Sequence, residues 1–314
     1  MKTSKSMIMK KVLVATEKPF AAAAVKGIRS IAEDAGYELI LLEKYTDPAD
    51  LLKAVGSADA MIVRSDLVTP EVIQAGKNLK IVVRAGAGFD NINLPAATAA
   101  GVVVMNTPGQ NSNAVAELVF GMMIYQVRSQ FSGASGTELL GKTIGLHAYG
   151  NVGKNVARIA KGFGMTVTAF DPFIEKDVMI QDKIKPVDSV EELYSSCHFV
   201  SLHIPANEQT KKSINFDLMS KMPKGAMLVN TARKEVICED SLQRIFAERD
   251  DFRYVSDVAP ECLAALKENY AGRFFVTPKK MGAQTSEANV NAGLAAARQI
   301  VDFFEKGDTR FKVN

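Results

Sequence analysis

Residues 143–171 predict a β-strand, a glycine turn, a helix and a second strand, in the sequence TIGLHAYGNVGKNVARIAKGFGMTVTAFD. The two flanking runs, 143–147 and 165–170, are short, apolar and rich in β-branched residues. Between them, apolar side chains recur at helical spacing at Val152, Val156, Ile159, Ala160 and Phe163. A strand, a crossover helix and a second strand form a βαβ unit, so this stretch predicts an α/β fold with a parallel sheet.

The glycine turn of this unit predicts a dinucleotide site. Gly150 and Gly153, at the start of the helix, let the backbone approach a pyrophosphate, whose charge is stabilised by free N–H groups and the helix dipole. Asp171 ends the second strand, where its carboxylate can accept hydrogen bonds from a ribose diol. A 2′-phosphate would meet a like charge there, which favours NAD over NADP. Ala148 replaces the usual first glycine, and a glycine turn alone is also compatible with a plain strand-to-helix connection.

The composition of the chain excludes several classes of partner. At 314 residues, with 47% apolar and 23% charged residues, it is typical of a soluble globular protein with room for two domains. The net charge of +3 arises from interspersed acidic and basic residues without a basic stripe, so we expect no nucleic acid partner. The most apolar helix candidate, 114–127, contains Glu117 and is too short to span a bilayer, so we expect no membrane partner.

Cysteine usage and the N-terminal residues bear on location. The three cysteines are an odd number at no metal-like spacing, which predicts no metal site and a reducing, cytoplasmic compartment: Cys197, Cys238 and Cys262. The N-terminal MKTSKSMIMK has no long apolar run and no arginine-rich amphipathic pattern, so we interpret it as a ragged start rather than a targeting segment.

The order of the predicted elements indicates two α/β domains. Five short β-type runs alternate with helical patterns such as 21–34 and 48–55; the runs are 12–15, 38–42, 60–63, 80–84 and 102–105. The pattern breaks at NTPG, 106–109, and a long apolar helix follows at 114–128. After 143–171, further strands are predicted at 198–203, 226–230, 253–257 and 274–276.

The final helix, 286–306, is long enough to return to the first domain. We therefore predict two doubly wound parallel-sheet domains: a discontinuous, flavodoxin-like substrate domain of residues 1–107 and 286–314, and a Rossmann NAD-binding domain of residues 108–285 inserted in it.

Polar residues that follow the predicted strands are the candidate site residues, because ligands bind beyond the carboxyl ends of parallel strands. In the first domain they are 64–65, 84–88 with 90–91, and 111–113; in the second they are 203–205, 230–233, Asp257 and 277–280. Arg64, Arg84 and the glycine loop that follows Arg84 suit a small substrate bearing a carboxylate and a phosphate. Either arginine alone is also compatible with a solvated surface position, and 111–113 could equally cap the next helix.

The three histidines have different expected roles. His147 and His198 lie within predicted strands and are expected to be core residues. His203 is followed closely by Pro205, so we expect it to shape the cofactor groove rather than perform acid–base chemistry.

Seven motifs carry a family resemblance that runs from about residue 12 to residue 304: VRSD at Val63, VVRAGAGFDNI at Val82, VMNTPGQNSNAVAEL at Val104, GTELLGKTIG at Gly136, FDP at Phe170, SLHIP at Ser201 and NTARKEVI at Asn230. In these motifs the chain resembles the D-isomer-specific 2-hydroxyacid dehydrogenases. The resemblance implies a two-domain enzyme that transfers a hydride from the hydroxyl-bearing carbon of a phosphorylated 2-hydroxy acid to NAD, and a homodimer formed through the NAD-binding domain. The alternatives are a reductase of glyoxylate or hydroxypyruvate in the same family, and an NAD-sensing corepressor of the same fold.

The resemblance also implies roles for individual residues. Arg233 matches the arginine that binds the substrate carboxylate and polarises the carbonyl. The implied substrate contacts are Arg64, Ser65, Arg84, Ala85, Gly86, Ala87, Gly88 and Asn111. The implied cofactor contacts are Tyr149, Gly150, Asn151, Val152, Gly153, Asp171, Pro172, His203, Ile204, Pro205, Thr210, Thr231, Ala232 and Asp257.

The chain departs from the family where the catalytic histidine is expected. The family pattern T-P-H-I-G-A is replaced by TPKKMGA at 277–283, so the resemblance leaves Lys279 or Lys280 at that position. We prefer Lys280, because Met281 and Gly282 then match the apolar residue and the glycine that follow the histidine. A lysine amine can transfer the proton if its pKa falls from about 10.4, which partial burial beside Arg233 would favour. Glu261 is displaced by one position from the family's glutamate and stays unassigned.

A second departure concerns the segment 128–136. It is shorter than in many family members, and the chain contains no Trp, so the resemblance does not extend to an aromatic contact lent by this segment across a dimer.

Overall fold

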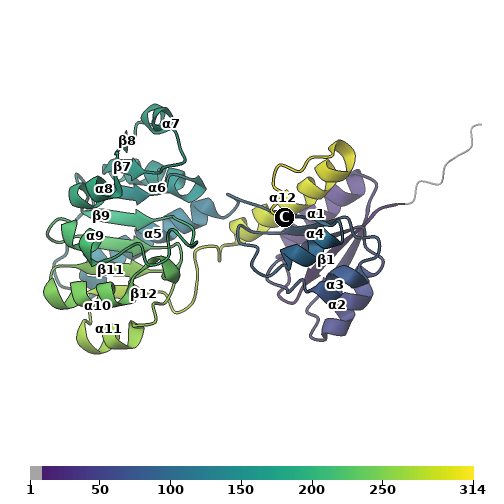
Figure 1. Cartoon of the computed structure of the whole chain (residues 1–314), viewed down its shortest axis with the longest axis horizontal. Coiled ribbons are helices and arrows are strands. Elements are labelled where there is room, and N and C mark those ends of the chain that lie inside the picture. The colour runs from purple at the N-terminus through teal and green to yellow at the C-terminus, as the bar shows by residue number, and fades with distance from the viewer. Residues whose placement is uncertain (1–8) are drawn as a thin grey trace, which may run out of the picture. The chain divides into compact units, whose positions relative to one another are not determined.

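The computed structural model describes residues 9–314, which form two compact units (Figure 1). The chain up to Asn111, together with Thr285–Asn314, forms unit 1, and Ser112–Gln284 forms unit 2. The sequence analysis places these borders after residues 107 and 285 instead. The first eight residues of the N-terminal start discussed above lie outside the described residues.

Unit 1 is a parallel sheet with helices on both faces. Its five strands have the order β2-β1-β3-β4-β5, with the bounds β1 Lys11–Thr16, β2 Glu38–Glu43, β3 Ala60–Val63, β4 Ile81–Arg84 and β5 Val103–Asn106. Its helices are α1 Ala22–Asp34, α2 Pro48–Val55, α3 Pro70–Ala75, α4 Leu94–Ala99 and α12 Ser286–Lys306. This strand order is that of flavodoxin-like folds, with the topological switch point between β1 and β3.

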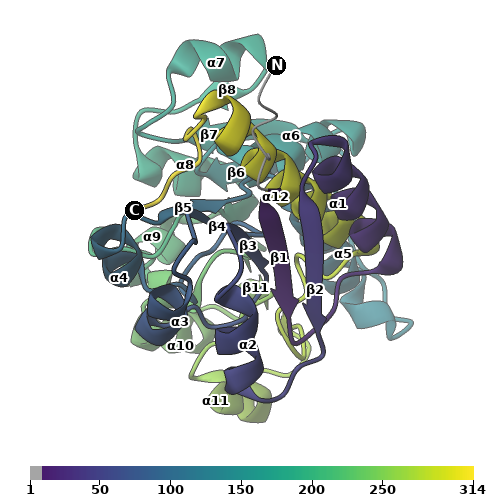
Figure 2. The same ribbon diagram turned by 90° about the vertical axis from the view of Figure 1, so that its right-hand side faces the viewer.

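Both faces of this sheet are buried, which explains why its strands are continuous apolar runs. Val12 and Val14 of β1 pack with α1 and α12, whereas Leu13 and Ala15 pack with α2 and α3. Figure 2 shows α1 and α12 on one side of the sheet and α2, α3 and α4 on the other. The return of α12 to this unit builds the predicted discontinuous fold.

Helix starts in unit 1 follow the expected capping chemistry. The side chains of Asp47, Thr69, Asn93 and Thr285 accept hydrogen bonds from backbone N–H groups in the first turns of α2, α3, α4 and α12. The last helix ends at Gly307, whose φ of 66° is left-handed. These local signals are why the predicted bounds of α2 and α12 are confirmed.

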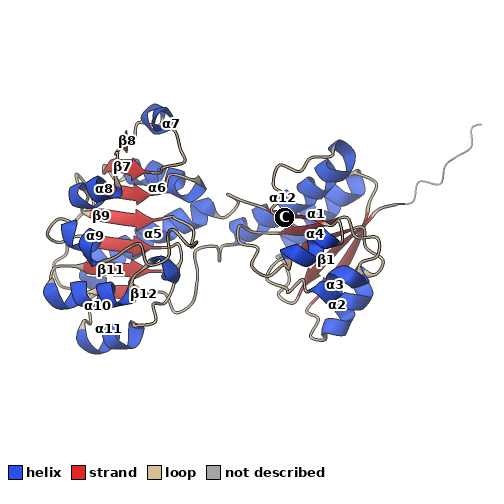
Figure 3. Cartoon of the chain, viewed as in Figure 1, coloured by secondary structure: helices blue, strands red, loops and turns tan. Residues whose placement is uncertain are grey.

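Unit 2 is a larger doubly wound sheet (Figure 3). Its seven strands have the order β12-β11-β10-β9-β6-β7-β8, with the bounds β6 Thr143–His147, β7 Thr166–Phe170, β8 Lys185–Pro186, β9 Phe199–Leu202, β10 Met227–Asn230, β11 Arg253–Ser256 and β12 Phe274–Val276. All described strand pairs are parallel. The order reverses between β6 and β9, as in the Rossmann fold, so the predicted fold class is confirmed.

The helices of unit 2 divide between the two faces of its sheet. On one face lie α5 Ser112–Val127, α6 Asn151–Gly162 and α7 Lys176–Gln181. On the other lie α8 Val190–Ser196, α9 Phe216–Lys221, α10 Glu239–Glu248 and α11 Leu263–Asn269. Strand β8 and the helices of six or seven residues were not predicted from the sequence. Within residues 9–314, no helix is both long and apolar enough to cross a membrane.

Candidate active site

The glycine turn between β6 and α6 is shaped by close backbone approach. A Cβ atom added to Gly153 would lie 2.5 Å from the carbonyl oxygen of Ala148, so the first turn of α6 packs too tightly for any side chain. Ala148 itself has a φ of 87°, a left-handed conformation that the usual glycine adopts without strain. The alanine therefore keeps the turn but at a conformational cost of about 1 kcal/mol or more.

Gly150 differs from Gly153, because no contact within the described residues requires glycine at this position. It is the N-cap of α6, and a Cβ atom added there would meet no atom of residues 9–314 within 4 Å. No side chain of the described residues caps this helix, so its first N–H groups remain available. Open space beside free N–H groups at a helix N-terminus fits a pyrophosphate.

The two glycines give a matched test of this interpretation. We expect Gly150→Ala to weaken NAD binding by about tenfold or more while leaving the melting temperature unchanged, because the added methyl group fills only the ligand's space. Gly153→Ala should weaken binding and also lower stability by about 1–3 kcal/mol, because the clash is with backbone. Fluorescence titration with NAD and thermal melts of both variants measure the two effects. A Gly150→Ala protein that binds NAD like the wild type would contradict the assignment.

Asp171 is held in place by the same turn. Its Oδ2 accepts a hydrogen bond from the Tyr149 N–H at 2.8 Å, and its Oδ1 accepts one from the Phe173 N–H at 2.9 Å. A carboxylate has about four lone-pair sites, so two backbone bonds leave acceptor capacity for a ribose diol. The Tyr149 side chain points elsewhere, since its hydroxyl donates to Asp182 at 2.9 Å. Tyr149 therefore stabilises the turn through the hydrogen bond that its backbone N–H donates to Asp171.

A cavity of about 380 Å³ lies on the α8 and α9 side of this turn. His147, Phe170, Val190 and Leu218 line it, together with Thr210, a predicted cofactor contact. Thr210 is fixed by its hydroxyl, which donates to the Pro205 carbonyl at 2.6 Å. The rest of its lining is polar or charged, so the cavity offers hydrogen-bonding groups beside a small apolar surface: Glu191, Gln209, Ser213, Asn215, Asp217 and Lys221.

The histidines of this region are neutral. Burial, together with a smaller effect of the neighbouring His147, lowers the pKa of His203 to about 3. Burial likewise lowers the pKa of His147 to about 4, against the opposing effect of Asp171. The backbone N–H of His203 donates a hydrogen bond to the backbone carbonyl of His147 at 2.9 Å, which joins the ends of β9 and β6. At neutral pH neither ring is an imidazolium, so neither adds positive charge to this region.

The loop after β10 presents Arg233 on a fixed backbone. Asn230 is fully buried, and its amide bridges the loop by donating to the Arg233 carbonyl at 3.0 Å and accepting from the Ala232 N–H at 3.0 Å. Arg233 Nη1 donates to the Ala232 carbonyl at 3.0 Å. The predicted cofactor contacts Thr231 and Ala232 are buried within the same loop. Asn230, one of the polar residues collected after the predicted strands, is thus a positioning residue, a role that sequence reasoning did not assign to it.

The segment that carries the two lysines is anchored by Asp257. The Asp257 carboxylate is 1% exposed and accepts hydrogen bonds from the Thr277 hydroxyl at 2.9 Å, the Met281 N–H at 2.7 Å and the Gly282 N–H at 2.8 Å. A Cβ atom at Gly282 would lie only 3.0 Å from Asp257 Oδ2. Asp257, predicted as a cofactor contact, therefore also clamps both ends of the 277–282 loop.

The expected partial burial of Lys280 is wrong in this structure. Lys279 and Lys280 are both exposed, because the loop leaves the sheet after β12 and buries only its ends at Thr277 and Gly282. Glu261 stays unassigned: its carboxylate accepts a hydrogen bond from Lys234 at 3.0 Å. Asp257 therefore fixes the loop that presents the exposed amines of Lys279 and Lys280 at the carboxyl edge of the sheet.

In unit 1, the carboxyl ends of neighbouring strands bring the predicted substrate contacts together. Val63 is in register with Arg84, and Arg84 with Asn106, which places Arg64 beside Arg84. Arg64 Nη1 donates to the Lys18 and Pro19 carbonyls, both at 3.1 Å, and Nη2 donates to Asn289 Oδ1 at 2.6 Å. Burial lowers its pKa without removing its charge. Arg64 therefore ties the loop after β1 to α12 and has fewer donors left for a ligand.

Arg84 lies over the glycine loop. Its Nε donates to the Arg64 carbonyl at 2.9 Å, and its Nη1 occupies the space that a Cβ atom at Gly86 would fill, at 1.4 Å. Gly86 also has a φ of 151°, so this position requires glycine on both grounds. Buried Asp66 links the neighbouring loops. Its carboxylate accepts hydrogen bonds from the Glu17 N–H at 2.7 Å and from the Tyr45 hydroxyl at 2.9 Å. Asp66 is a second positioning residue that the sequence analysis missed, although it is part of the VRSD motif.

The remaining predicted residues have simpler outcomes. Asn113 lies inside α5, where its side chain contacts Glu117 and Arg158 rather than capping the helix. His198 is held by Thr143, whose hydroxyl lies 2.9 Å from its Nδ1. Among residues 9–314, no cluster of three or more His, Cys, Asp or Glu side chains could hold a metal ion. The structure thus collects the predicted residues at the carboxyl edges of the two sheets, each within its own unit.

The chain is similar to known proteins over most of its length. Residues 115–277 match the family model of the D-isomer specific 2-hydroxyacid dehydrogenase, NAD binding domain. The chain is 34% identical to a hydroxypyruvate reductase of Thermotoga maritima, covering 84% of this chain and 90% of that protein. It is 35% identical to a D-3-phosphoglycerate dehydrogenase of Methanocaldococcus jannaschii over 80% of this chain, and it spans about half the length of that relative.

A solved structure is similar over almost the whole chain. The crystal structure of NAD⁺-bound 3-phosphoglycerate dehydrogenase of Entamoeba histolytica shares 49% sequence identity with this chain, with a TM-score of 0.85. The match covers 98% of this chain and 99% of that one.

Proposed function

The chain belongs to the D-isomer specific 2-hydroxyacid dehydrogenases, and from this premise we propose that it oxidises 3-phospho-D-glycerate to 3-phosphohydroxypyruvate with NAD, the first step of serine biosynthesis. The observation that carries the choice of substrate is the pair Arg64 and Arg84 beside the Gly86 loop, which supplies positive charge and N–H groups suited to a phosphate. The likeness to a 3-phosphoglycerate dehydrogenase over nearly the full chain supports it.

The proposed reaction assigns one task to each group. Arg233 binds the substrate carboxylate and polarises the oxygen that becomes the carbonyl. The Lys280 amine accepts the hydroxyl proton during oxidation and returns it during reduction. Bound NAD supplies the acceptor for the hydride that leaves the hydroxyl-bearing carbon. Asn230 and Asp257 fix the two loops that present Arg233 and Lys280.

A second candidate is the reduction of hydroxypyruvate or glyoxylate, favoured by the Thermotoga maritima relative. An NAD-sensing role without turnover is disfavoured by Arg233 and by an exposed amine on an anchored loop. Steady-state turnover of 3-phosphoglycerate, D-glycerate, glycolate and lactate with NAD and NADP, and of hydroxypyruvate and glyoxylate with the reduced cofactors, decides among the three. The proposal requires 3-phosphoglycerate to have the highest kcat/KM among the hydroxy acids. The absence of turnover on all of them would leave the sensing role.

The phosphate assignment can be tested within the same assay. We expect Arg84→Ala to raise the KM for 3-phosphoglycerate by about tenfold or more but to change that for D-glycerate little, because a charge-assisted contact contributes about 1.5–3 kcal/mol. Arg64→Ala should show the same selectivity with an added loss of stability, since its guanidinium ties Lys18, Pro19 and Asn289 together. If both variants slow the two substrates equally, neither arginine recognises phosphate.

We further propose a cytoplasmic homodimer formed through unit 2. The long helix α5 is apolar almost all round, which is typical of a helix covered on all sides. Exposed Phe131, Leu140 and Phe163 flank it, and Phe163 stacks on Phe120 of α5. The three cysteines are free, which fits a reducing compartment.

A further inference from the structure

The loops that carry Arg233 and Lys280 are joined at one edge of the unit 2 sheet. The backbone N–H of Asp257 donates a hydrogen bond to the Asn230 carbonyl at 2.9 Å, where the loop of Arg233 begins. The carboxylate of the same Asp257 holds the loop of Lys280 through two backbone N–H groups. Both cationic side chains therefore leave the carboxyl edge of the sheet from backbone that one residue fixes.

A primary amine at this position allows a reaction that the family's histidine does not. Both groups can transfer a proton. An imidazole nitrogen that adds to a carbonyl carbon stays within its aromatic ring and cannot form a double bond to that carbon. A lysine amine can complete this step and form an imine, as lysines do with carbonyl substrates. The lysines of TPKKMGA, at 277–283, therefore add nucleophilic chemistry to proton transfer.

In the proposed reaction Lys280 comes close to the carbonyl carbon of the product. A group that takes the hydroxyl proton lies about 2.6–3.2 Å from the substrate oxygen. After the hydride has left, this oxygen is a carbonyl oxygen, about 1.2 Å from its carbon. Rotation of the lysine stem brings its nitrogen to about 3–3.5 Å from that carbon, the distance from which attack occurs. Arg233, which polarises the carbonyl in the proposed reaction, makes the carbon more electrophilic.

The exposure of Lys280 supplies the proton step that an attack requires. Once the side chain has accepted the hydroxyl proton it is an ammonium, which has no lone pair for a nucleophilic attack. Because Lys280 is exposed rather than buried, the ammonium can release a proton to water instead of returning it to the product oxygen. The resulting amine lies beside the carbonyl group that the oxidation has just produced.

We propose that Lys280 forms a reversible imine with the 2-keto acid product, which stays bound until the imine is hydrolysed. The inference rests on the proposed function, because that function places the amine beside the carbonyl. The amine nitrogen bonds to the carbonyl carbon, and the carbonyl oxygen leaves as water with two protons of the lysine ammonium. The third proton stays on the imine nitrogen. The carbon keeps its oxidation state, so the step consumes no oxidant or reductant.

Reduction with sodium cyanoborohydride traps an imine as a stable amine. The full chain is incubated with 3-phosphohydroxypyruvate and saturating NAD, which fills the cofactor position without supplying a hydride, before the reagent is added. A pH of about 8 keeps a small share of lysine amines uncharged. Peptide mass spectrometry should find Lys280 heavier by the mass of the keto acid less one oxygen atom. Without the keto acid or the reagent, Lys280 should stay unmodified.

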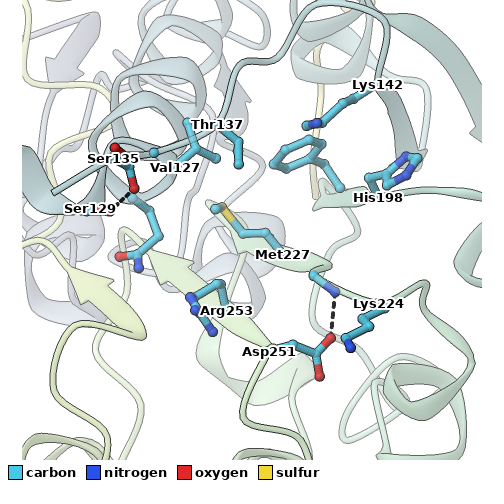
Figure 4. A pocket seen from close by; sticks show the side chains of 14 residues that line it. Val127, Ser129, Ser135, Thr137, Lys142, His198, Lys224, Met227, Asp251 and Arg253 are labelled. Atoms are coloured by element: carbon cyan, nitrogen blue, oxygen red, sulfur yellow. Dashed lines mark hydrogen bonds between the residues drawn. The ribbon is translucent and has the colours of Figure 1, made fainter.

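Other lysines of unit 2 measure unspecific labelling. Lys224 is exposed and, with Arg253, lines a cavity of about 500 Å³ at the amino ends of the strands (Figure 4). Lys267 is exposed on α11. Neither belongs to the loops that Asp257 joins, so Lys280 should be labelled about tenfold or more faster than either.

Lys280→His is the matched variant, because histidine can transfer a proton but cannot form the imine. It should keep more turnover than Lys280→Ala and give no adduct at residue 280. If this variant does not fold, the labelling pattern of the wild type decides alone.

Turnover of 3-phosphoglycerate with NAD is measured on the same preparations, which separates the imine from the proposed function. An active wild type that labels Lys280 no faster than Lys224 and Lys267 would overturn the imine and leave the proposed function standing. An adduct at Lys279 in place of Lys280 would also overturn the assignment. A wild type with neither turnover nor adduct would overturn both proposals.

Discussion

Replacing Lys280 with alanine should lower turnover by about two to four orders of magnitude, the scale on which a general acid–base group contributes. The affinity for NAD should stay nearly unchanged, because the glycine turn and Asp171, which are the proposed cofactor contacts, lie on other loops. Lys280 is exposed in the structure, so its removal leaves no cavity in the core. Steady-state kinetics with saturating NAD, together with an NAD titration, measure both quantities.

The neighbouring lysine is the matched control. Lys279→Ala removes the same charge from the same exposed loop and should change turnover by less than about threefold, the scale of a surface substitution. With an amine as the proton acceptor, the oxidation rate should continue to rise above the pH range in which an imidazole, with a pKa of about 6.5, is already deprotonated. A Lys279→Ala enzyme that is inactive beside an active Lys280→Ala enzyme would exchange the two roles. If both Lys279→Ala and Lys280→Ala are active, neither lysine transfers the proton.

The features that could be predicted from the sequence are those set by local chemistry. The fold class follows from the period of apolar residues and from glycine turns, and the bounds of α12 follow from the Thr285 cap and Gly307. Site residues such as Arg64, Arg84 and Arg233 were predicted because parallel strands bring their carboxyl ends to one edge of a sheet. These signals need only the neighbouring residues of the chain.

The features that were missed depend on contacts between distant residues. Asn230 and Asp66 position the loops of Arg233 and Arg64, yet nothing in their sequence neighbourhood distinguishes a brace from a surface polar residue. The partners of Arg64 include Asn289, 225 residues away, so its guanidinium could not be recognised as partly engaged. The expected burial of Lys280 failed for the same reason, since burial depends on what the loop packs against. A buried acid directly after a strand, as at Asp257, is the one signal that could have indicated an anchor.

Asp257→Ala should lower turnover by about a hundredfold even when NAD is saturating, because the carboxylate anchors the loop that carries Lys280. The substitution leaves the N–H groups of Met281 and Gly282 without their acceptor; the Gly282 N–H is buried, and an unsatisfied buried group costs about 1–3 kcal/mol. The loop then no longer holds Lys280 at one place, and a displacement of about 1 Å is enough for a loss of this size. Stability should fall by about 2–4 kcal/mol in denaturant titrations.

Two further variants separate this clamp from the cofactor contact predicted for Asp257. Thr277→Val removes one hydrogen bond to the carboxylate but keeps both backbone bonds, so its effect on turnover should be about tenfold or less. In a Lys280→Ala background, Asp257→Ala should lower turnover little further, because a residue that acts through Lys280 has nothing left to position. If Asp257 serves only the cofactor, Asp257→Ala will instead raise the dissociation constant for NAD, and kcat at saturation will be that of the wild type. The kinetic difference between these outcomes decides whether the buried carboxylate holds the loop for catalysis or only contacts the nucleotide.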